Sequence, residues 1–149
     1  MPSELSSEMI AQIVGAVFET MMSLDVERSG VPWVASDDRL TSAVALSGND
    51  WNGTFLFECN RGEARRLAGC FLSMDTPDAV DEDVISVLGE LANMIGGNMK
   101  CVMTEGTVLS MPTVTDGNSL KIDGAEVRNR VAFHCAEGDF WVTVLATPS

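Results

Sequence analysis

The chain has 149 residues, of which 46% are hydrophobic, and its 22 Asp and Glu residues outnumber nine Lys and Arg to give a net charge of -13. This length is sufficient to bury one hydrophobic core without disulfides or a structural metal, so we expect a single domain over residues 1–149. The negative charge repels phosphate backbones and anionic lipid surfaces, which excludes nucleic acid as a partner.

The first half of the chain predicts a helix, a loop and a hairpin. Over 5–24, apolar residues recur at three- and four-residue intervals, which is the helical period. Glycine, proline and aspartate over 28–38 predict a connecting loop. Apolar runs at 40–47 and 54–59 flank the turn-rich segment 48–53, and this pattern predicts two strands joined as a β-hairpin.

Two further helices are predicted in the middle of the chain. One begins at Asn60, whose side chain is suited to cap it while Glu63 lies three residues on, and it ends near Met74. The other follows the acidic run 81–83, because the positive end of a helix dipole favours carboxylates, and it continues to about Cys101.

The last third of the chain predicts short strands separated by glycine-containing turns. The strand candidates are 107–113, 119–123, 127–135 and 140–146. Most consecutive strands are close enough in sequence to form hairpins. We therefore expect an α+β fold in which a largely antiparallel sheet of about six strands packs against three helices.

The third helix has an apolar face and a polar face. Its predicted core residues are Val84, Ile85, Leu88, Leu91, Ala92, Ile95, Met99 and Val102. Ser86, Glu90 and Asn93 fall on the opposite side, together with Gly89, Gly97 and Lys100. Since residues three and four apart are neighbours on a helix, Ser86, Glu90 and Asn93 should point into solvent together.

Three glycines, Gly89, Gly96 and Gly97, interrupt this helix. Each should weaken it by about 1 kcal/mol relative to alanine. A missing side chain lets another backbone come close to the helix. The approaching element is either a docking protein or another helix of the same fold.

The side chains of Glu90 and Asn93 suit one kind of phosphoryl chemistry. An amide offers both a donor and an acceptor, so Asn93 can hold a water molecule in a fixed line of attack. An aspartyl phosphate is already activated, and its divalent cation sits in the phosphorylated protein, so a helper protein need supply only a positioned water and a docking contact. Glu90 can supply that contact to a lysine. An exposed Glu-x-x-Asn pair alone is a weak signal, because such residues usually form an ordinary solvated face.

The whole segment resembles the phosphatase signature of the CheC, CheX and FliY family, in which Asp or Ser, then Glu four residues later, then Asn three after that, mark one helix. Ser86, Glu90 and Asn93 match all three positions, and the following 94–98 also looks like the family. The signature ends in a proline on the next strand, for which Pro112 is the candidate, nearer to Asn93 than the family pattern has it.

Other parts of the chain extend the likeness. The 47–53 hairpin with Trp51, the 63–72 helix and the acidic lead into the third helix all look CheX-like. CheC and FliY usually repeat the motif near the N-terminus, whereas the first helix here has no Glu-x-x-Asn. A single motif indicates CheX.

The resemblance implies a hydrolase that acts on the aspartyl phosphate of a phosphorylated CheY-like response regulator in chemotaxis. By resemblance, Glu90 pairs with the regulator's lysine, Asn93 enters its active site to orient the attacking water, and Ser86 has a supporting place. No cofactor of its own is expected, and the Mg²⁺ belongs to the regulator. The resemblance also implies a homodimer joined at an edge strand such as 127–135.

Two other functions are compatible with the residues. A non-catalytic binding or scaffold module in two-component signalling would keep the same fold and docking helix. An enzyme for a small phosphorylated molecule ranks last, because the chain has no Gly-rich phosphate loop and no metal-ligand cluster. His134, the only histidine, is expected to be a partly buried strand residue and not a catalytic base.

The cysteines and the N-terminus bear on the cellular compartment. The four cysteines are far apart, without a C-x-x-C pair, and we expect all of them to be reduced core residues: Cys59, Cys70, Cys101 and Cys135. The first four residues include an acid where a secretory signal would be basic. No apolar run approaches the roughly 20 residues of a membrane span. The sequence thus predicts a cytoplasmic protein without membrane contact.

Overall fold

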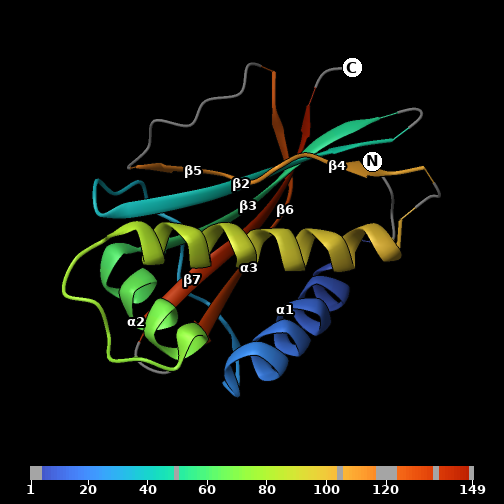
Figure 1. Ribbon diagram of the computed structural model, residues 1–149. Helices are drawn as coiled ribbons and strands as arrows, with labels where there is room; N and C mark the ends of the chain where they lie inside the picture. Colours follow the sequence, from blue (N-terminus) through green and yellow to red (C-terminus); the bar gives the residue numbers. More distant parts are fainter. Residues whose placement is uncertain (1–4, 49–50, 104–105, 117–123, 136–137, 148–149) are drawn as a thin grey trace.

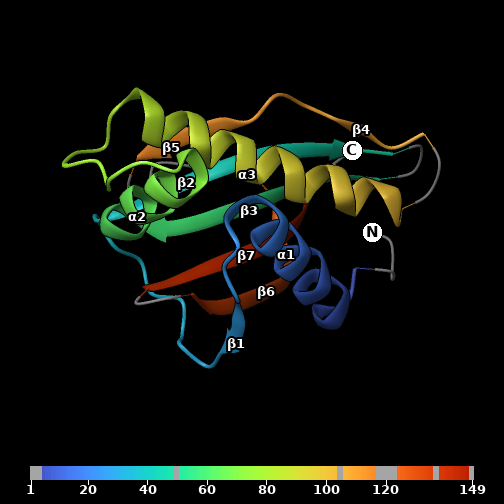
Figure 2. The same cartoon turned by 60° about the horizontal axis from the view of Figure 1, so that its bottom comes forward.

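The computed structural model describes residues 5–48, 51–103, 106–116, 124–135 and 138–147, and within them three helices pack on one face of a seven-stranded sheet (Figures 1 and 2). The helices are α1 (Ser7–Met22), α2 (Arg61–Leu72) and α3 (Glu82–Cys101). The strands are β1 (Glu27–Ser29), β2 (Arg39–Ser47), β3 (Asn52–Asn60), β4 (Val108–Leu109), β5 (Thr113–Asp116), β6 (Glu126–Cys135) and β7 (Gly138–Thr147). The predicted α+β class is confirmed.

The sheet has the strand order β1-β6-β7-β3-β2-β4, and β5 also pairs with β2. Every pairing between these strands is antiparallel. The predicted hairpin is present as β2 and β3, whose register runs from Arg39 opposite Asn60 to Ser47 opposite Asn52. This hairpin and β7 form the centre of the sheet, beneath α3 (Figure 1).

The core lies between the sheet and the helices, and stacked phenylalanines from four elements fill its centre. The Phe140 ring on β7 lies 4.8 Å from the Phe18 ring of α1, 5.0 Å from the Phe57 ring of β3 and 5.1 Å from the Phe133 ring of β6, measured between centroids. All four rings are almost fully buried. Aromatic rings bury much apolar surface each, so this cluster ties α1 to the sheet.

The start of α3 is fixed by its capping residue. The Asp81 side chain accepts a hydrogen bond of 3.0 Å from the Val84 amide, and acidic residues occupy the first turn as the helix dipole favours. The buried side of α3 packs on β2 and β3, and α1 and α2 both pack against one side of the helix (Figure 2). These contacts hold one long side of α3 at the surface, where the predicted polar residues lie.

The strand predicted at 107–113 is instead two short strands, β4 and β5, that pair with opposite ends of β2. Between them, the Ser110 amide donates to the Ala45 carbonyl at 3.0 Å, and the Ser110 hydroxyl accepts from the Ala45 amide at 2.9 Å. Pro112 follows, and a proline has no N–H to donate to a sheet. The ladder is therefore interrupted between β4 and β5.

Other local expectations need correction. The segment 28–38 begins inside a short strand, β1, which pairs with Ala132–His134 of β6 and is too short to show a strand pattern in the sequence. Asn60 is the N-cap of α2, but its side chain makes no capping hydrogen bond. The predicted strand 119–123 lies outside the described residues.

Candidate functional site

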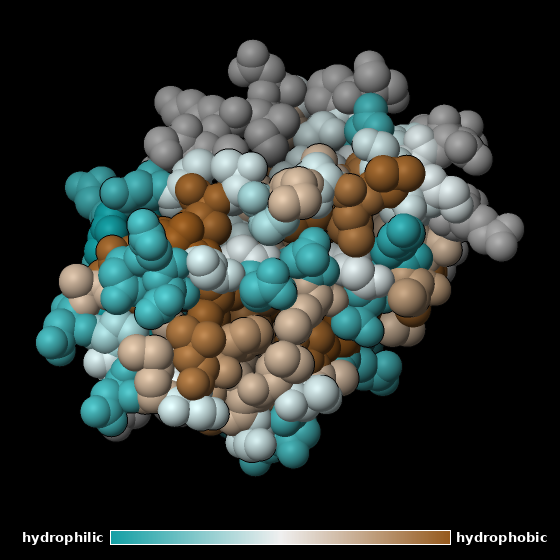
Figure 3. All heavy atoms as spheres, viewed as in Figure 1, coloured by the Kyte–Doolittle hydropathy of each residue, from teal (hydrophilic) through white to brown (hydrophobic). Residues whose placement is uncertain are grey.

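The candidate site is the α3 polar stripe, formed by Ser86, Glu90 and Asn93. All three residues are exposed, as the helical spacing predicts. Their side chains make no hydrogen bond or ion pair with any other residue that the structure describes. Figure 3 shows this face, with polar side chains along α3 above an apolar band that lies over the space between α3 and α1. The stripe is open to a visiting protein.

The boundary between the exposed and buried sides of α3 differs from the one that the sequence predicts. Ile85, expected in the core, is 38% exposed, whereas Gly89, expected on the open side, is buried. Val87, absent from the predicted core, is only 2% exposed. The reason is that α3 is flanked by α1 on one side and by β4 and β5 on the other. The helical period cannot reveal these lateral neighbours.

The three glycines of α3 have different surroundings. A Cβ at Gly96 would lie 3.1 Å from Leu109 Cδ2 of β4, and one at Gly89 would lie 3.5 Å from Pro112 Cγ. These two glycines let the segment after α3 pass close to the helix, so the approaching element is a strand segment and not a helix. A Cβ at Gly97 would meet nothing within 4 Å. Gly97 lies one turn after Asn93, so it leaves space beside the stripe.

Pro112 lies next to the stripe. Its ring packs over Gly89, the residue immediately before Glu90. Sequence reasoning selected Pro112 only as the proline that follows the motif, and could not show that it contacts α3. Its neighbour Met111 is 83% exposed, so the edge of the stripe formed by the β4–β5 connection is partly apolar.

The geometry of α3 and the sheet agrees with a known family. The family model described as chemotaxis phosphatase CheX matches residues 40–136, which include all of the β2–β3 hairpin except Arg39, together with α2, α3 and β6. The chain belongs to the CheX family. A search of curated proteins finds no match.

The fold of this CheX-family chain is similar to several crystal structures. CheX from Vibrio vulnificus has a TM-score of 0.77 at 18% identity, with 96% of this chain and 98% of that chain covered. CheX from Desulfovibrio desulfuricans has a TM-score of 0.75 at 20% identity, with 94% and 97% covered. The CheX-CheY-BeF3-Mg complex from Borrelia burgdorferi has a TM-score of 0.73 at 16% identity, with 95% and 97% covered. At such identities these likenesses show the fold.

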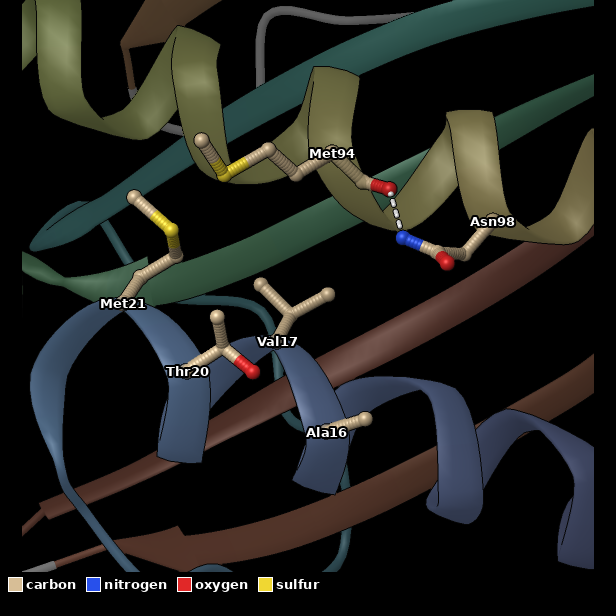
Figure 4. Close-up of a pocket in the computed structure, with 6 residues that line it drawn as sticks. All are labelled: Ala16, Val17, Thr20, Met21, Met94 and Asn98. Carbon is tan, nitrogen blue, oxygen red and sulfur yellow. Dashed lines mark hydrogen bonds between the residues drawn. The ribbon is translucent and has the colours of Figure 1, made fainter.

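A groove lies beside the stripe in this CheX-family chain. It has a volume of about 300 Å³ between α1 and α3, and its lining residues are Ala16, Val17, Thr20, Met21, Met94 and Asn98 (Figure 4). The Asn98 side-chain amide donates to the Met94 carbonyl at 2.8 Å, one turn back on the same helix. No residue of the polar stripe lines the groove. Asn98 is thus bonded to its own helix, whereas the Asn93 amide is free of such a bond.

Several predicted environments in this CheX-family chain need correction. Cys59 and Cys135 are buried, but Cys70 and Cys101 are exposed on the outer sides of their helices. His134 is exposed and not partly buried, and its Nδ1 lies 3.0 Å from a carboxylate oxygen of Asp139. A cysteine within an apolar segment is buried only if it lies on the face of the helix or strand that packs on the core. The residue spacing did not show on which face Cys70 and Cys101 lie.

The described residues outside the stripe include a buried carboxyl group with a raised pKa. The Glu63 carboxyl on α2 is 3% exposed, and burial raises its pKa although Arg66 at 3.0 Å acts in the opposite direction. No group of three or more His, Cys, Asp and Glu side chains in the described part could hold a metal. Nor is any helix there long and apolar enough to cross a bilayer.

Proposed function

We propose that this chain is a phosphatase that hydrolyses the aspartyl phosphate of a phosphorylated CheY-like response regulator. The observation that carries the proposal is that Glu90 and Asn93 project side by side from an exposed face of α3 with no other described residue bonded to them. The membership of the CheX family supports the reaction. The Borrelia burgdorferi structure, a complex of CheX with CheY, supports the choice of partner.

Asn93 orients the attacking water in this proposal. Its amide oxygen accepts a hydrogen bond from the water, and its amide N–H₂ remains available to donate to a phosphoryl oxygen. Phosphoryl transfer depends on alignment and charge neutralisation, and the regulator's own Mg²⁺ supplies the neutralisation. The chain therefore needs no metal or cofactor of its own.

Glu90 docks the regulator, and Ser86 has a supporting place. Glu90 precedes Asn93 by three residues, so the two side chains are neighbours on one face of the helix. A carboxylate at this place forms a charge-assisted hydrogen bond with a lysine of the regulator, which fixes the orientation of the receiver domain. Ser86, four residues before Glu90, extends the same contact surface toward the start of α3.

The protein acts as a cytoplasmic homodimer in this proposal. The expected edge strand 127–135 is partly covered, because β1 pairs with Ala132–His134. The outer edge of residues 126–131 of β6 has no partner among the described strands. Such an edge can pair with another chain. The mass measured by light scattering should be that of two chains, and a single-chain mass at assay concentrations would contradict this.

The test measures phosphate release from a phosphorylated CheY-like regulator with Mg²⁺. Asn93→Ala should lower kcat on the order of 10²-fold, since it removes a group that orients the reacting water. Glu90→Ala should mainly raise KM, because it removes a docking contact. Equal rates for these variants and the unchanged protein would refute the proposal.

Matched controls come from the same helix. Asn98→Ala and Glu82→Ala remove an exposed amide and an exposed carboxylate of α3 outside the stripe, and neither should change kcat or KM appreciably. Binding of the phosphorylated regulator without faster dephosphorylation would instead identify a scaffold module.

A further inference from the structure

The β4–β5 connection, residues 110–112, runs along one side of α3. It approaches the helix at two glycines. A Cβ at Gly96 would lie 3.1 Å from Leu109 Cδ2, just before the connection, and one at Gly89 would lie 3.5 Å from Pro112 Cγ, at its end. The connection therefore follows the helix over about two turns.

Asn93 lies between these two points of approach. It follows Gly89 by four residues and precedes Gly96 by three, so the three residues share one side of α3. Met111, in the middle of the connection, consequently passes at the level of Asn93. Glu90 is turned away from this side, because it is rotated by about 100° from Gly89.

The backbone around Met111 is held in place from both directions. The Ser110 amide donates to the Ala45 carbonyl at 3.0 Å, and the Ser110 hydroxyl accepts from the Ala45 amide at 2.9 Å. The same hydroxyl donates to the Met111 carbonyl at 3.0 Å. On the other side of Met111, the Pro112 ring fixes its own φ and packs over Gly89. Met111 thus starts from a fixed backbone position.

The Met111 side chain is nevertheless 83% exposed, more than any other large hydrophobic residue in the described part of the chain. Ile85, one turn before Gly89 on the same side of α3, is also exposed. Figure 3 shows apolar side chains on this side of α3, over the region of β4 and β5. Isolated exposed apolar residues are normal, but here they border the stripe on its Asn93 side.

Electrostatics gives this apolar border a purpose. The chain has a net charge of -13, and Glu82, Asp83 and Glu90 are exposed on α3. A phosphoryl group adds negative charge to any receiver domain that docks there, so long-range forces do not favour the encounter. One exposed ion pair made by Glu90 contributes little affinity. The affinity must therefore come mainly from apolar surface that loses its water on docking.

We propose that Met111 makes an apolar contact with the docked receiver domain, beside the phosphoryl group that Asn93 approaches. This inference rests on the proposed function and adds to it the contact that supplies affinity. A methionine suits the role because its flexible thioether adapts to the partner surface, while the fixed backbone limits the entropy lost on docking. The contact exists before and during hydrolysis, so it should affect binding and not the chemical step.

The test measures binding and turnover for two variants of Met111. The binding partner is a CheY-like regulator loaded with beryllofluoride and Mg²⁺, the groups present in the Borrelia burgdorferi complex, because beryllofluoride mimics a phosphoryl group without being hydrolysed. Met111→Gln makes the side chain polar at nearly constant length, and it should raise Kd and KM about tenfold with kcat little changed. Met111→Leu keeps the apolar contact and should stay within about twofold of the unchanged protein.

A second exposed methionine supplies the matched control. Met74 is 46% exposed, follows α2 and lies outside the β4–β5 connection, so Met74→Gln should change neither Kd nor KM. Urea denaturation should show the same stability for both glutamine variants as for the unchanged protein, since both side chains are exposed. An unchanged Kd for Met111→Gln, or an equal rise in Met74→Gln, would overturn the proposal.

The result is separable from the test of the phosphatase itself. The proposed reaction depends on the turnover lost in Asn93→Ala, whereas the Met111 contact depends on a Kd measured without hydrolysis. Lost turnover in Asn93→Ala with normal binding by Met111→Gln would leave the phosphatase in place and remove the Met111 contact. Weaker binding by Met111→Gln with full turnover in Asn93→Ala would keep the contact and remove the proposed reaction mechanism.

Discussion

Gly96 and Gly97 are adjacent on α3 but differ in what an added methyl group would touch. Replacing each glycine with alanine therefore adds the same methyl group to the same helix, but in two different environments. At Gly97 a Cβ has nothing within 4 Å, whereas at Gly96 it would lie 3.1 Å from Leu109 Cδ2 and 3.7 Å from Val44 Cγ1. Gly97→Ala should therefore be more stable than Gly96→Ala.

The magnitudes follow from helix propensity and packing. Alanine is better than glycine in a helix interior by roughly 0.8–1.0 kcal/mol, and Gly97→Ala should gain this amount in full. In a domain of this size the gain corresponds to a rise in Tm of about 2–4 °C. Gly96→Ala gains the same propensity but must displace Leu109, and overpacking costs about 1–3 kcal/mol. Gly96→Ala should therefore be neutral or destabilising.

Urea denaturation of the two variants measures this difference. Gly97→Ala should be more stable than Gly96→Ala by at least about 1 kcal/mol. Equal stabilities of the two variants, or a loss of stability in Gly97→Ala, would refute the conclusion that Gly97 has open space beside it and Gly96 is crowded by Leu109. The phosphatase assay on Gly97→Ala adds a functional readout, because a methyl group beside Asn93 should hinder a closely docked regulator. Under the proposed function, the stabilised variant should have a higher KM.

Two further predictions concern buried and exposed side chains. Burial raises the pKa of the Glu63 carboxyl above its usual 4.5, so the folded protein binds the Glu63 proton more tightly than the unfolded chain does. The stability that this proton contributes is present at low pH and is lost as the pH rises above 4.5. The free energy of unfolding of wild type relative to Glu63→Gln should therefore fall from pH 4 to pH 7, and a constant difference across urea titrations would contradict this. Cys70 and Cys101 should react with a thiol reagent in the native protein, while the two buried cysteines react only after unfolding, and four equally reactive thiols would contradict the burial pattern.

Local patterns in the sequence predicted the elements that carry the candidate site. The 3.6-residue period of α3 placed Ser86, Glu90 and Asn93 together on an exposed face, because side-chain direction along a helix depends only on spacing. The β2–β3 hairpin was equally predictable, since two apolar runs joined by a turn-rich segment must pair locally. Both inferences use residues that are close in sequence.

The errors arose where distant segments meet. Ile85 and Gly89 changed places between core and surface because α3 is flanked by α1 and by the segment after it, and no pattern within α3 contains that information. Cys70 and Cys101 were expected in the core for the same reason. The segment predicted as one strand at 107–113 contains Pro112, which cannot donate a backbone hydrogen bond to β2. The segment therefore pairs with β2 as two separate strands, β4 and β5.

The sequence by itself thus determined the order of most helices and strands, the exposure of Glu90 and Asn93 on α3, and the family resemblance. Each of these depends on residues that are close in sequence, and the geometry of a helix or strand fixes how such residues lie relative to one another. Only the tertiary structure decided that Pro112 packs beside the stripe, and that the β4–β5 connection brings Met111 to the level of Asn93. These residues come together through strand register and a segment that folds back along α3, and such long-range contacts leave no periodic signal in the chain.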